Sequence, residues 1–324
     1  MARAVSGLAP RHRRARRMGP RSVARARVPW SARVSRGAVL YGFLLPIVLL
    51  YAVFSLYPIV ETFELSFFDA KIVEQGPFVG LDNYRALLRT RDFVQALGNT
   101  VLFTAASTTV ALTIALALAV LVSLPWVRGQ TFFKVVFFLP VVTSLVAVGY
   151  VWKWMLDPSY GVINAALGLA GVRPGPRWLS DPGLALWSLV AVNVWKWIGY
   201  FQVIFLANLQ AIDPHYYEAA AIDGAGPWRR FLRITLPLLR AAIVLSVILA
   251  VVNFLKAFAL VFVMTQGGPA GRTELLATYV YREAFGTGQL RFGFSAAASV
   301  VLFAMIMAFT VASNRAGRAG EVAL

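Results

Sequence analysis

The sequence predicts an all-α integral membrane protein with six transmembrane helices. Of its 324 residues, 59% are hydrophobic and 14% are charged, whereas roughly 25% are charged in a typical soluble domain. The mean hydropathy is +0.69. Six apolar stretches are each long enough to cross about 30 Å of hydrocarbon as a helix. They cover residues 37–59, 99–123, 133–155, 184–208, 241–264 and 292–313.

The first stretch is too long for a cleavable signal peptide, and no A-x-A cleavage site follows it. A strongly basic segment precedes it: residues 1–36 hold 11 of the 31 Lys and Arg and no acid. We expect this tail to be disordered against the anionic headgroups of the lipid bilayer, and Met18 is an alternative start within it. The tail lacks the repeated aromatic residues that stack on bases, so nucleic acid is not an expected partner.

The positions of the basic residues predict the orientation of the six helices. With the N-terminus inside, the inner segments hold 19 Lys and Arg and the outer segments hold nine, and the basic tail decides this difference. Both termini are therefore predicted on the cytoplasmic side of a multi-pass protein in the cell membrane. The predicted divisions are a tail over 1–36, the first helix with its outer segment over 37–94, a core over 95–313 and a cytoplasmic tail over 314–324.

Several kinds of chemistry are excluded or disfavoured. The chain has no Cys, its two His are far apart, and it contains no G-x-x-x-x-G-K-[ST] phosphate loop. The six apolar stretches contain no His, Asp or Glu, which disfavours a membrane-bound enzyme. We therefore expect no metal or cofactor in this chain, and no catalytic residues.

The segment between the fourth and fifth stretches has helical structure of its own. Asp213 is expected to cap a short helix, Gly224 interrupts that helix, and Pro227 can begin a second one. The segment therefore predicts two short helices joined at a glycine elbow on the cytoplasmic face. It could be an amphipathic element that seals the bundle, or a docking element for a cytosolic partner.

Residues 213–238 resemble the EAA loop of type I ABC importer permeases, whose pattern is E-A-A-x3-G-x9-I-x-L-P. The resemblance implies a helix that docks in a groove of an ATPase subunit. The docking residues that it implies are Glu218, Ala219, Ala220, Asp223, Gly224, Ile234, Leu236 and Pro237.

Other stretches resemble the carbohydrate branch of these permeases, which includes maltose and glycerol-phosphate systems: residues 57–59, 78–84, 265–269 and 281–285. The resemblance covers about residues 40–313 and implies the type I permease fold for the core. It further implies a second homologous permease subunit, two cytosolic ATPase subunits that bind ATP, and an extracytoplasmic solute-binding protein. The implied function is import of a sugar or related polyol. Within the matched loop, Gly267-Gly268-Pro269 is expected to form a turn.

Apart from Lys134 at the inner end of the third stretch, the lysines within the apolar stretches are Lys153, Lys196 and Lys256, and a charge inside a bilayer is costly. Lys153 lies near an outer end and can reach the interface. The residues predicted to line a substrate pathway are Asn193, Lys196, Asn253, Phe254, Lys256 and Phe258. The family's carbohydrate branch often has an acid three residues after the last lysine, and here that position is Ala259. Helix–helix hydrogen bonding is the alternative role for Asn193.

Two alternative functions remain open from the sequence. One is a type I importer for glycerol phosphate, a peptide or an amino acid. The other is a secondary carrier, which would work without ATPase subunits and would often show an inverted internal repeat; we find no such repeat in the sequence.

Overall fold

The computed structural model describes residues 30–71, 76–124, 126–286 and 290–321. Every regular element in these residues is a helix, and the one β-bridge pairs Phe68 with Phe78. The chain divides into two compact units, one ending at Tyr57 and the other beginning at Pro58. Most of the basic tail, residues 1–29, lies outside the described residues.

The first unit contains helix α1 (Trp30–Tyr51) and a π-helical turn over Ala52–Leu56. The helix begins before residue 37, so the end of the predicted disordered tail is helical. Most apolar side chains over residues 41–57 are exposed. A helix that is apolar on all sides and has few protein neighbours is typical of a helix that faces lipid.

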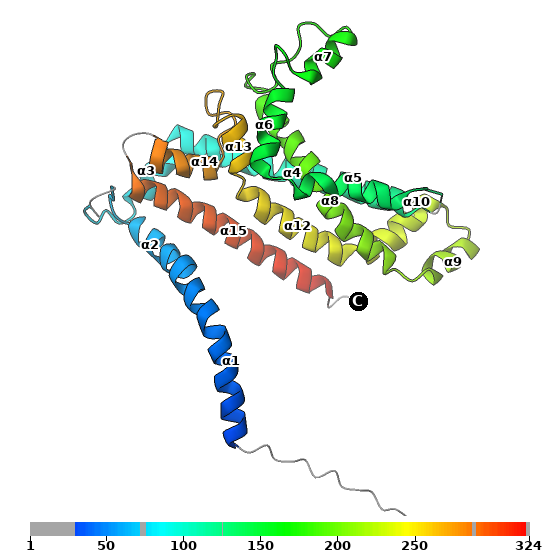
Figure 1. Cartoon of the computed structure of the whole chain (residues 1–324), viewed down its shortest axis with the longest axis horizontal. Coiled ribbons are helices and arrows are strands. Elements are labelled where there is room, and N and C mark those ends of the chain that lie inside the picture. The colour runs from blue at the N-terminus through cyan, green and yellow to red at the C-terminus, as the bar shows by residue number, and fades with distance from the viewer. Residues whose placement is uncertain (1–29, 72–75, 125, 287–289, 322–324) are drawn as a thin grey trace, which may run out of the picture. The chain divides into compact units, whose positions relative to one another are not determined.

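The second unit contains the remaining helices, which Figure 1 shows as a bundle with short helices at its ends. The longest three are α4 (Arg91–Ser123), α8 (Ala185–Gln210) and α15 (Phe292–Glu321). The others are α2 (Tyr57–Leu65), α3 (Asp82–Arg89), α5 (Gln130–Val142), α6 (Leu145–Met155), α7 (Val162–Leu169), α9 (His215–Ile222), α10 (Pro227–Arg230), α11 (Leu236–Leu238), α12 (Arg240–Leu255), α13 (Ala259–Met264) and α14 (Leu276–Tyr281), with π-helical turns over Phe231–Thr235 and Arg282–Gly286.

Four of the six predicted spans are continuous helices that are long and apolar enough to cross a membrane: Tyr41–Leu65, Arg91–Ser123, Ala185–Gln210 and Phe292–Ser313. The other two predicted spans are broken. The third bends by 100° between α5 and α6. The fifth is interrupted between α12 and α13, and just before its start the helix over Pro227–Leu238 meets α12 at 65°. The described residues therefore contain six spans when each bent pair is taken as one.

The breaks correct the prediction of two continuous helices over 133–155 and 241–264. In the third span, Pro140 lies near the end of α5, and Thr143 and Ser144 adopt extended backbone conformations. In the fifth span, α12 ends at Leu255 and α13 begins at Ala259, although no Gly or Pro lies between 241 and 264. No local breaker accounts for this second interruption, and the segment beyond it, α13, packs against α6.

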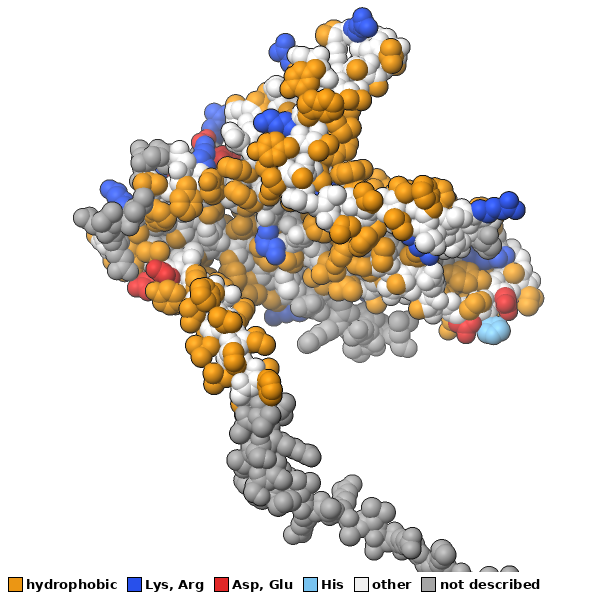
Figure 2. Space-filling model, in the orientation of Figure 1, with side chains coloured by type: hydrophobic (Ala, Val, Ile, Leu, Met, Phe, Trp, Pro, Cys, Tyr) orange, Lys and Arg blue, Asp and Glu red, His pale blue; other side chains and the backbone are white. Residues whose placement is uncertain are grey.

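The core of the second unit lies where α4 and α8 pack together, with α12 against α4. Ala111, Ala115 and Ala119 on α4 are fully buried, and small residues of this kind let membrane helices approach closely. Large buried rings, including Phe201 and Phe254, fill the remaining space. Figure 2 shows hydrophobic side chains over most of the visible flank of this unit; the acidic side chains lie toward its ends, and a few basic side chains lie between them. That distribution is expected of a bundle whose flank contacts lipid.

Candidate functional site

The helical elbow between α8 and α12 has the local structure that the sequence predicts. The carboxylate of Asp213 accepts a hydrogen bond of 2.9 Å from the backbone N–H of His215, at the start of α9. Gly224 ends α9 in the left-handed conformation, with φ of +72°. The backbone N–H of Ala225 reaches back to the Ala220 carbonyl oxygen at 2.9 Å, which closes a Schellman-type helix end.

The reason for the glycine is backbone conformation rather than close packing within this chain. A Cβ at residue 224 would meet no atom within 4 Å. A residue other than glycine would instead have to adopt a left-handed φ, which L-amino acids disfavour. The space around the elbow is open.

Two side-chain contacts hold the two arms of the elbow together. The hydroxyl oxygens of Tyr217 and Thr235 lie 3.0 Å apart and share a hydrogen bond between α9 and the second arm, residues 227–238. The Nε of Arg230 donates to the Ala225 carbonyl oxygen at 2.7 Å. The Arg230 hydrogen bond therefore holds the bend, and the Tyr217–Thr235 hydrogen bond joins one arm to the other.

The predicted docking residues form an accessible surface on this braced elbow. Glu218 is 68% exposed and lies 3.1 Å from the ring nitrogen Nδ1 of His215. Ala219, Asp223, Gly224 and Pro237 are exposed, and Ala220, Ile234 and Leu236 are partly buried. Figure 1 places α9 and α10 at the end of the second unit opposite α3 and α14.

Several exposed apolar side chains on this surface were not among the predicted docking residues, and the two most exposed flank the glycine. Ile222 is 88% exposed and Trp228 is 71% exposed, on either side of the glycine. Large exposed apolar side chains at the same place are typical of an interaction surface. Their positions just before and after the elbow could have identified them in the sequence.

The six predicted pathway residues do not share one environment. Asn193, Lys196 and Phe254 are buried, and Asn253 and Phe258 are half-buried. Lys256 is exposed and ends α12, at the break before α13. The side-chain nitrogen of Asn193 has no hydrogen-bond partner among the described residues. The Lys196 ammonium donates to three backbone carbonyl groups, which leaves it no donor for a solute.

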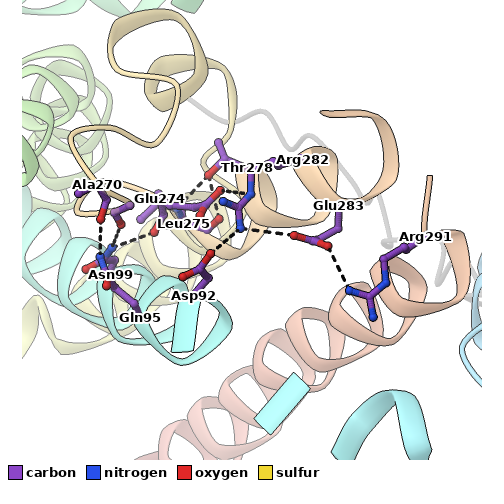
Figure 3. Close-up of polar contacts among 11 residues, drawn as sticks. Asp92, Gln95, Asn99, Ala270, Glu274, Leu275, Thr278, Arg282, Glu283 and Arg291 are labelled. Atoms are coloured by element: carbon purple, nitrogen blue, oxygen red, sulfur yellow. Dashed lines mark hydrogen bonds and ion pairs between the residues drawn. The ribbon is translucent and has the colours of Figure 1, made fainter. Parts of the chain in front are cut away.

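At the other end of the bundle, the loop between α13 and α14 is tied to α4 (Figure 3). The amide nitrogen of Asn99 donates to the carbonyl oxygens of Gly271 at 2.9 Å and Glu274 at 3.0 Å. Gly267 has φ of +85°, and the N–H of Gly268 donates to the Thr265 carbonyl oxygen at 2.9 Å, which confirms the predicted turn. The resemblance to a known loop indicated this turn, but not its anchor on α4.

A charged network stabilises the same loop. Arg282 lies within ion-pair distance of three carboxylates: Glu274 at 3.2 Å, Asp92 at 3.4 Å and Glu283 at 3.4 Å (Figure 3). Arg291 lies 3.8 Å from Glu283. Burial raises the pKa of Glu274 to about 7, although the neighbouring Arg282 opposes this shift. The loop therefore contains a carboxyl group that titrates near neutral pH.

Comparison with known proteins identifies the family. The family model described as "Binding-protein-dependent transport system inner membrane component" matches residues 115–318. The chain is 32% identical over 279 residues to the trehalose/maltose transport system permease protein MalF of Thermococcus litoralis, covering 86% of this chain and 93% of that protein. It is 36% identical over 267 residues to the lactose transport system permease protein LacF of Rhizobium radiobacter, covering 82% and 89%.

Among solved structures, the fold is similar to a chain in the crystal structure of a bacterial ABC transporter involved in the import of the acidic polysaccharide alginate. The TM-score is 0.78 at 24% sequence identity, and the match covers 88% of this chain and 97% of that chain. This likeness shows the type I permease fold. The matched family model spans more than half of the sequence, and the relatives align over most of it. The chain therefore belongs to the family of inner membrane components of binding-protein-dependent transport systems.

Proposed function

We propose that this chain is the membrane-spanning permease subunit of an ABC importer that translocates a sugar or related polyol delivered by a solute-binding protein. The observation that carries the proposal is the braced, exposed elbow over residues 213–238 in a chain of this family. The solute class is supported by relatives named for trehalose/maltose and lactose, and by the sulfoquinovosyl glycerol permease SmoG of Agrobacterium fabrum, which is 33% identical over 285 residues.

The energy for import comes from separate subunits, because the sequence contains no phosphate loop. The elbow is the element through which ATPase closure would reach the membrane. Its accessible surface offers a carboxylate at Glu218, a small face at Ala219, and the apolar side chains of Ile222 and Trp228. The hydrogen bond between Tyr217 and Thr235 joins α9 to the second arm, so a displacement of α9 would move residues 227–238 with it.

Solute recognition belongs to the polar and aromatic residues of α8, α12 and the break that follows α12. Asn253 offers an amide group and Phe258 a flat apolar face, both half-buried near the break, a combination that suits the hydroxyl groups and ring faces of a sugar. Asn193 and Phe254 are buried and would contact a solute only if the helices around them move apart. Lys256 is exposed at the break and would favour a solute with an anionic group. A sugar acid or sugar phosphate is therefore the second candidate class.

The test is reconstitution of the chain in proteoliposomes with the second permease, ATPase and binding protein from the same source. Uptake of labelled neutral disaccharides, sugar acids and amino acids is measured with ATP inside the vesicles. We expect uptake that requires ATP and the binding protein, and no ATP hydrolysis by the purified chain alone. Uptake that persists without the ATPase subunits would overturn the importer function, and uptake of amino acids only would overturn the solute class.

A further inference from the structure

The bend in the third span leaves an open helix end inside the bundle. Helix α5 ends at Val142 and α6 begins at Leu145, and Thr143 and Ser144 between them have ψ angles of 149° and 133°. A continuous helix would supply N–H partners four residues further on, and the last carbonyl groups of α5 lose them. The Pro140 carbonyl oxygen accepts locally from the Thr143 N–H at 3.3 Å and from the Thr143 hydroxyl at 2.6 Å, so this group is partly satisfied within the bend. Carbonyl groups without partners at membrane depth are costly, because hydrocarbon offers no hydrogen bonds.

A lysine from another helix donates hydrogen bonds to the carbonyl groups at this helix end. The Nζ of Lys196, on α8, lies 2.7 Å from the Pro140 carbonyl oxygen, 3.1 Å from that of Val141 and 2.8 Å from that of Thr143. Lys196 is 3% exposed. An ammonium group has three donors, so all of them are engaged.

The charge on this lysine is balanced by the helix end rather than by an acid. The apolar stretches of the chain contain no Asp or Glu. The aligned peptide dipoles of a helix place partial negative charge at its C-terminus, where a cation is favoured. Lys196 therefore acts on α5 as a capping cation supplied from a different helix.

Tight packing on both sides of the bend supports this arrangement. Gly199 lies one turn beyond Lys196 on α8, and a Cβ there would overlap the Phe137 carbonyl of α5. Gly149 of α6 packs against α13, where an added Cβ would lie 2.9 Å from a Val263 methyl group. Helix α5 is thus held on α8 and α6 on α13, and Lys196 stabilises the junction between them.

We propose that Lys196 is a positioning residue that holds the bend between α5 and α6, and that it does not contact the solute during import. The geometry carries this inference: three engaged donors, near-complete burial and a partner helix with an open end. It does not depend on which solute is carried. It also separates Lys196 from Lys153, which has the same Trp-Lys-Trp context but is exposed.

The bend can be measured directly because the chain has no Cys. Val136→Cys on α5 and Val151→Cys on α6 replace exposed residues, and nitroxide labels attached there report the distance between the helices by electron paramagnetic resonance. The measurement is made on the assembled importer in lipid. The parent, Lys196→Met, Lys196→Arg and, as the matched control, Lys153→Met are compared.

We expect Lys196→Met to broaden the distance distribution, and Lys153→Met and Lys196→Arg to keep the parent's narrow distribution, since arginine retains the donors. The maximal uptake rate of Lys196→Met should fall by about tenfold or more, because hydrogen bonds to a charged group are lost. Its half-saturating solute concentration should change by less than about twofold.

A Lys196→Met distribution identical to the parent's would overturn the proposal, as would a raised half-saturating concentration with an unchanged maximal rate. If Lys196→Met does not accumulate in membranes, the distance distribution and uptake of Lys196→Arg become the test of the proposal. A narrow distribution with retained uptake then supports positioning, and a broadened distribution or loss of uptake contradicts it. None of these distances depends on the identity of the solute, so failure here is distinguishable from failure of the proposed import function.

Discussion

Replacing Gly224 tests whether the shape of the elbow couples this chain to ATP hydrolysis. The residue has φ of +72°, and an added Cβ would meet no atom within 4 Å. The cost of Gly224→Ala within the chain is therefore conformational alone. For an L-residue in the left-handed region it is about 1–2 kcal/mol, which lowers the equilibrium constant for forming the intact elbow by a factor of roughly 5–30.

The chain offers a matched control two residues away. Gly226 has φ of −67° and ψ of 166°, a conformation open to any L-residue, and it too has no atom within 4 Å of an added Cβ. Gly226→Ala should leave transport unchanged. Gly224→Asn should be milder than Gly224→Ala, because asparagine tolerates the left-handed conformation better. Gly224→Leu adds bulk on an open surface and so tests clearance toward a partner.

The assay is solute uptake by whole cells, with co-purification of the ATPase and membrane abundance measured in parallel. We expect Gly224→Ala to lower uptake at unchanged abundance, by at most the factor of roughly 5–30 by which the equilibrium constant falls. Gly224→Leu should additionally weaken ATPase co-purification. Equal uptake by Gly224→Ala and Gly226→Ala would refute the conformational argument. Normal uptake by Gly224→Leu as well would mean that the elbow seals the bundle and does not dock.

Three further changes test the elbow, the break and the outer loop. Tyr217→Phe removes the hydroxyl that lies 3.0 Å from Thr235; the loss of about 1 kcal/mol should lower uptake a few-fold, and a Thr235→Ala change should add little to it in a double-mutant cycle. Lys256→Ala should reduce uptake at limiting solute more than Lys153→Ala does, since Lys256 is exposed at the break in the fifth span. Equal uptake by the two variants would show that Lys256 does not line the solute pathway. The pKa of Glu274 is raised by burial from 4.5 to about 7, so the folded loop binds a proton more tightly than the unfolded chain does. The stability that the folded loop gains from this bound proton is complete below about pH 4.5 and is lost as the pH rises to about 7. Limited proteolysis of the outer loops of the purified complex between about pH 5 and pH 8 should therefore accelerate with pH in the parent and less in Glu274→Gln; the same pH dependence in both would contradict the assignment.

The elbow could be predicted from the sequence because its determinants are local. Asp213 begins the first arm through a contact with His215 two residues away, and Gly224 ends it through its own backbone angle. The brace between Tyr217 and Thr235 was not predicted, since hydroxyl groups 18 residues apart carry no pattern of their own. The exposed apolar side chains of Ile222 and Trp228 were not predicted either, although both residues flank the glycine elbow in the sequence.

The two broken spans were missed because hydropathy averages over a window and does not register a change of direction. In the third span Pro140 was visible, but proline is tolerated in membrane helices and does not by itself predict a bend of 100°. In the fifth span no Gly or Pro marks the break at Lys256. Beyond this break α13 packs against α6, whose residues lie more than a hundred positions earlier in the chain, so no local pattern points to it.

Lys196 shows where reasoning from the sequence was sound and where it could go no further. A lysine in the middle of an apolar stretch is costly, so a compensating partner had to exist. A search for an acidic partner would fail, because the apolar stretches contain none. The partners are backbone carbonyl groups between 53 and 56 residues earlier in the chain, and they become acceptors only because α5 ends there. The buried charge and the broken helix therefore account for each other: the break supplies acceptors for the ammonium group, and the ammonium group lets the break exist within the bundle.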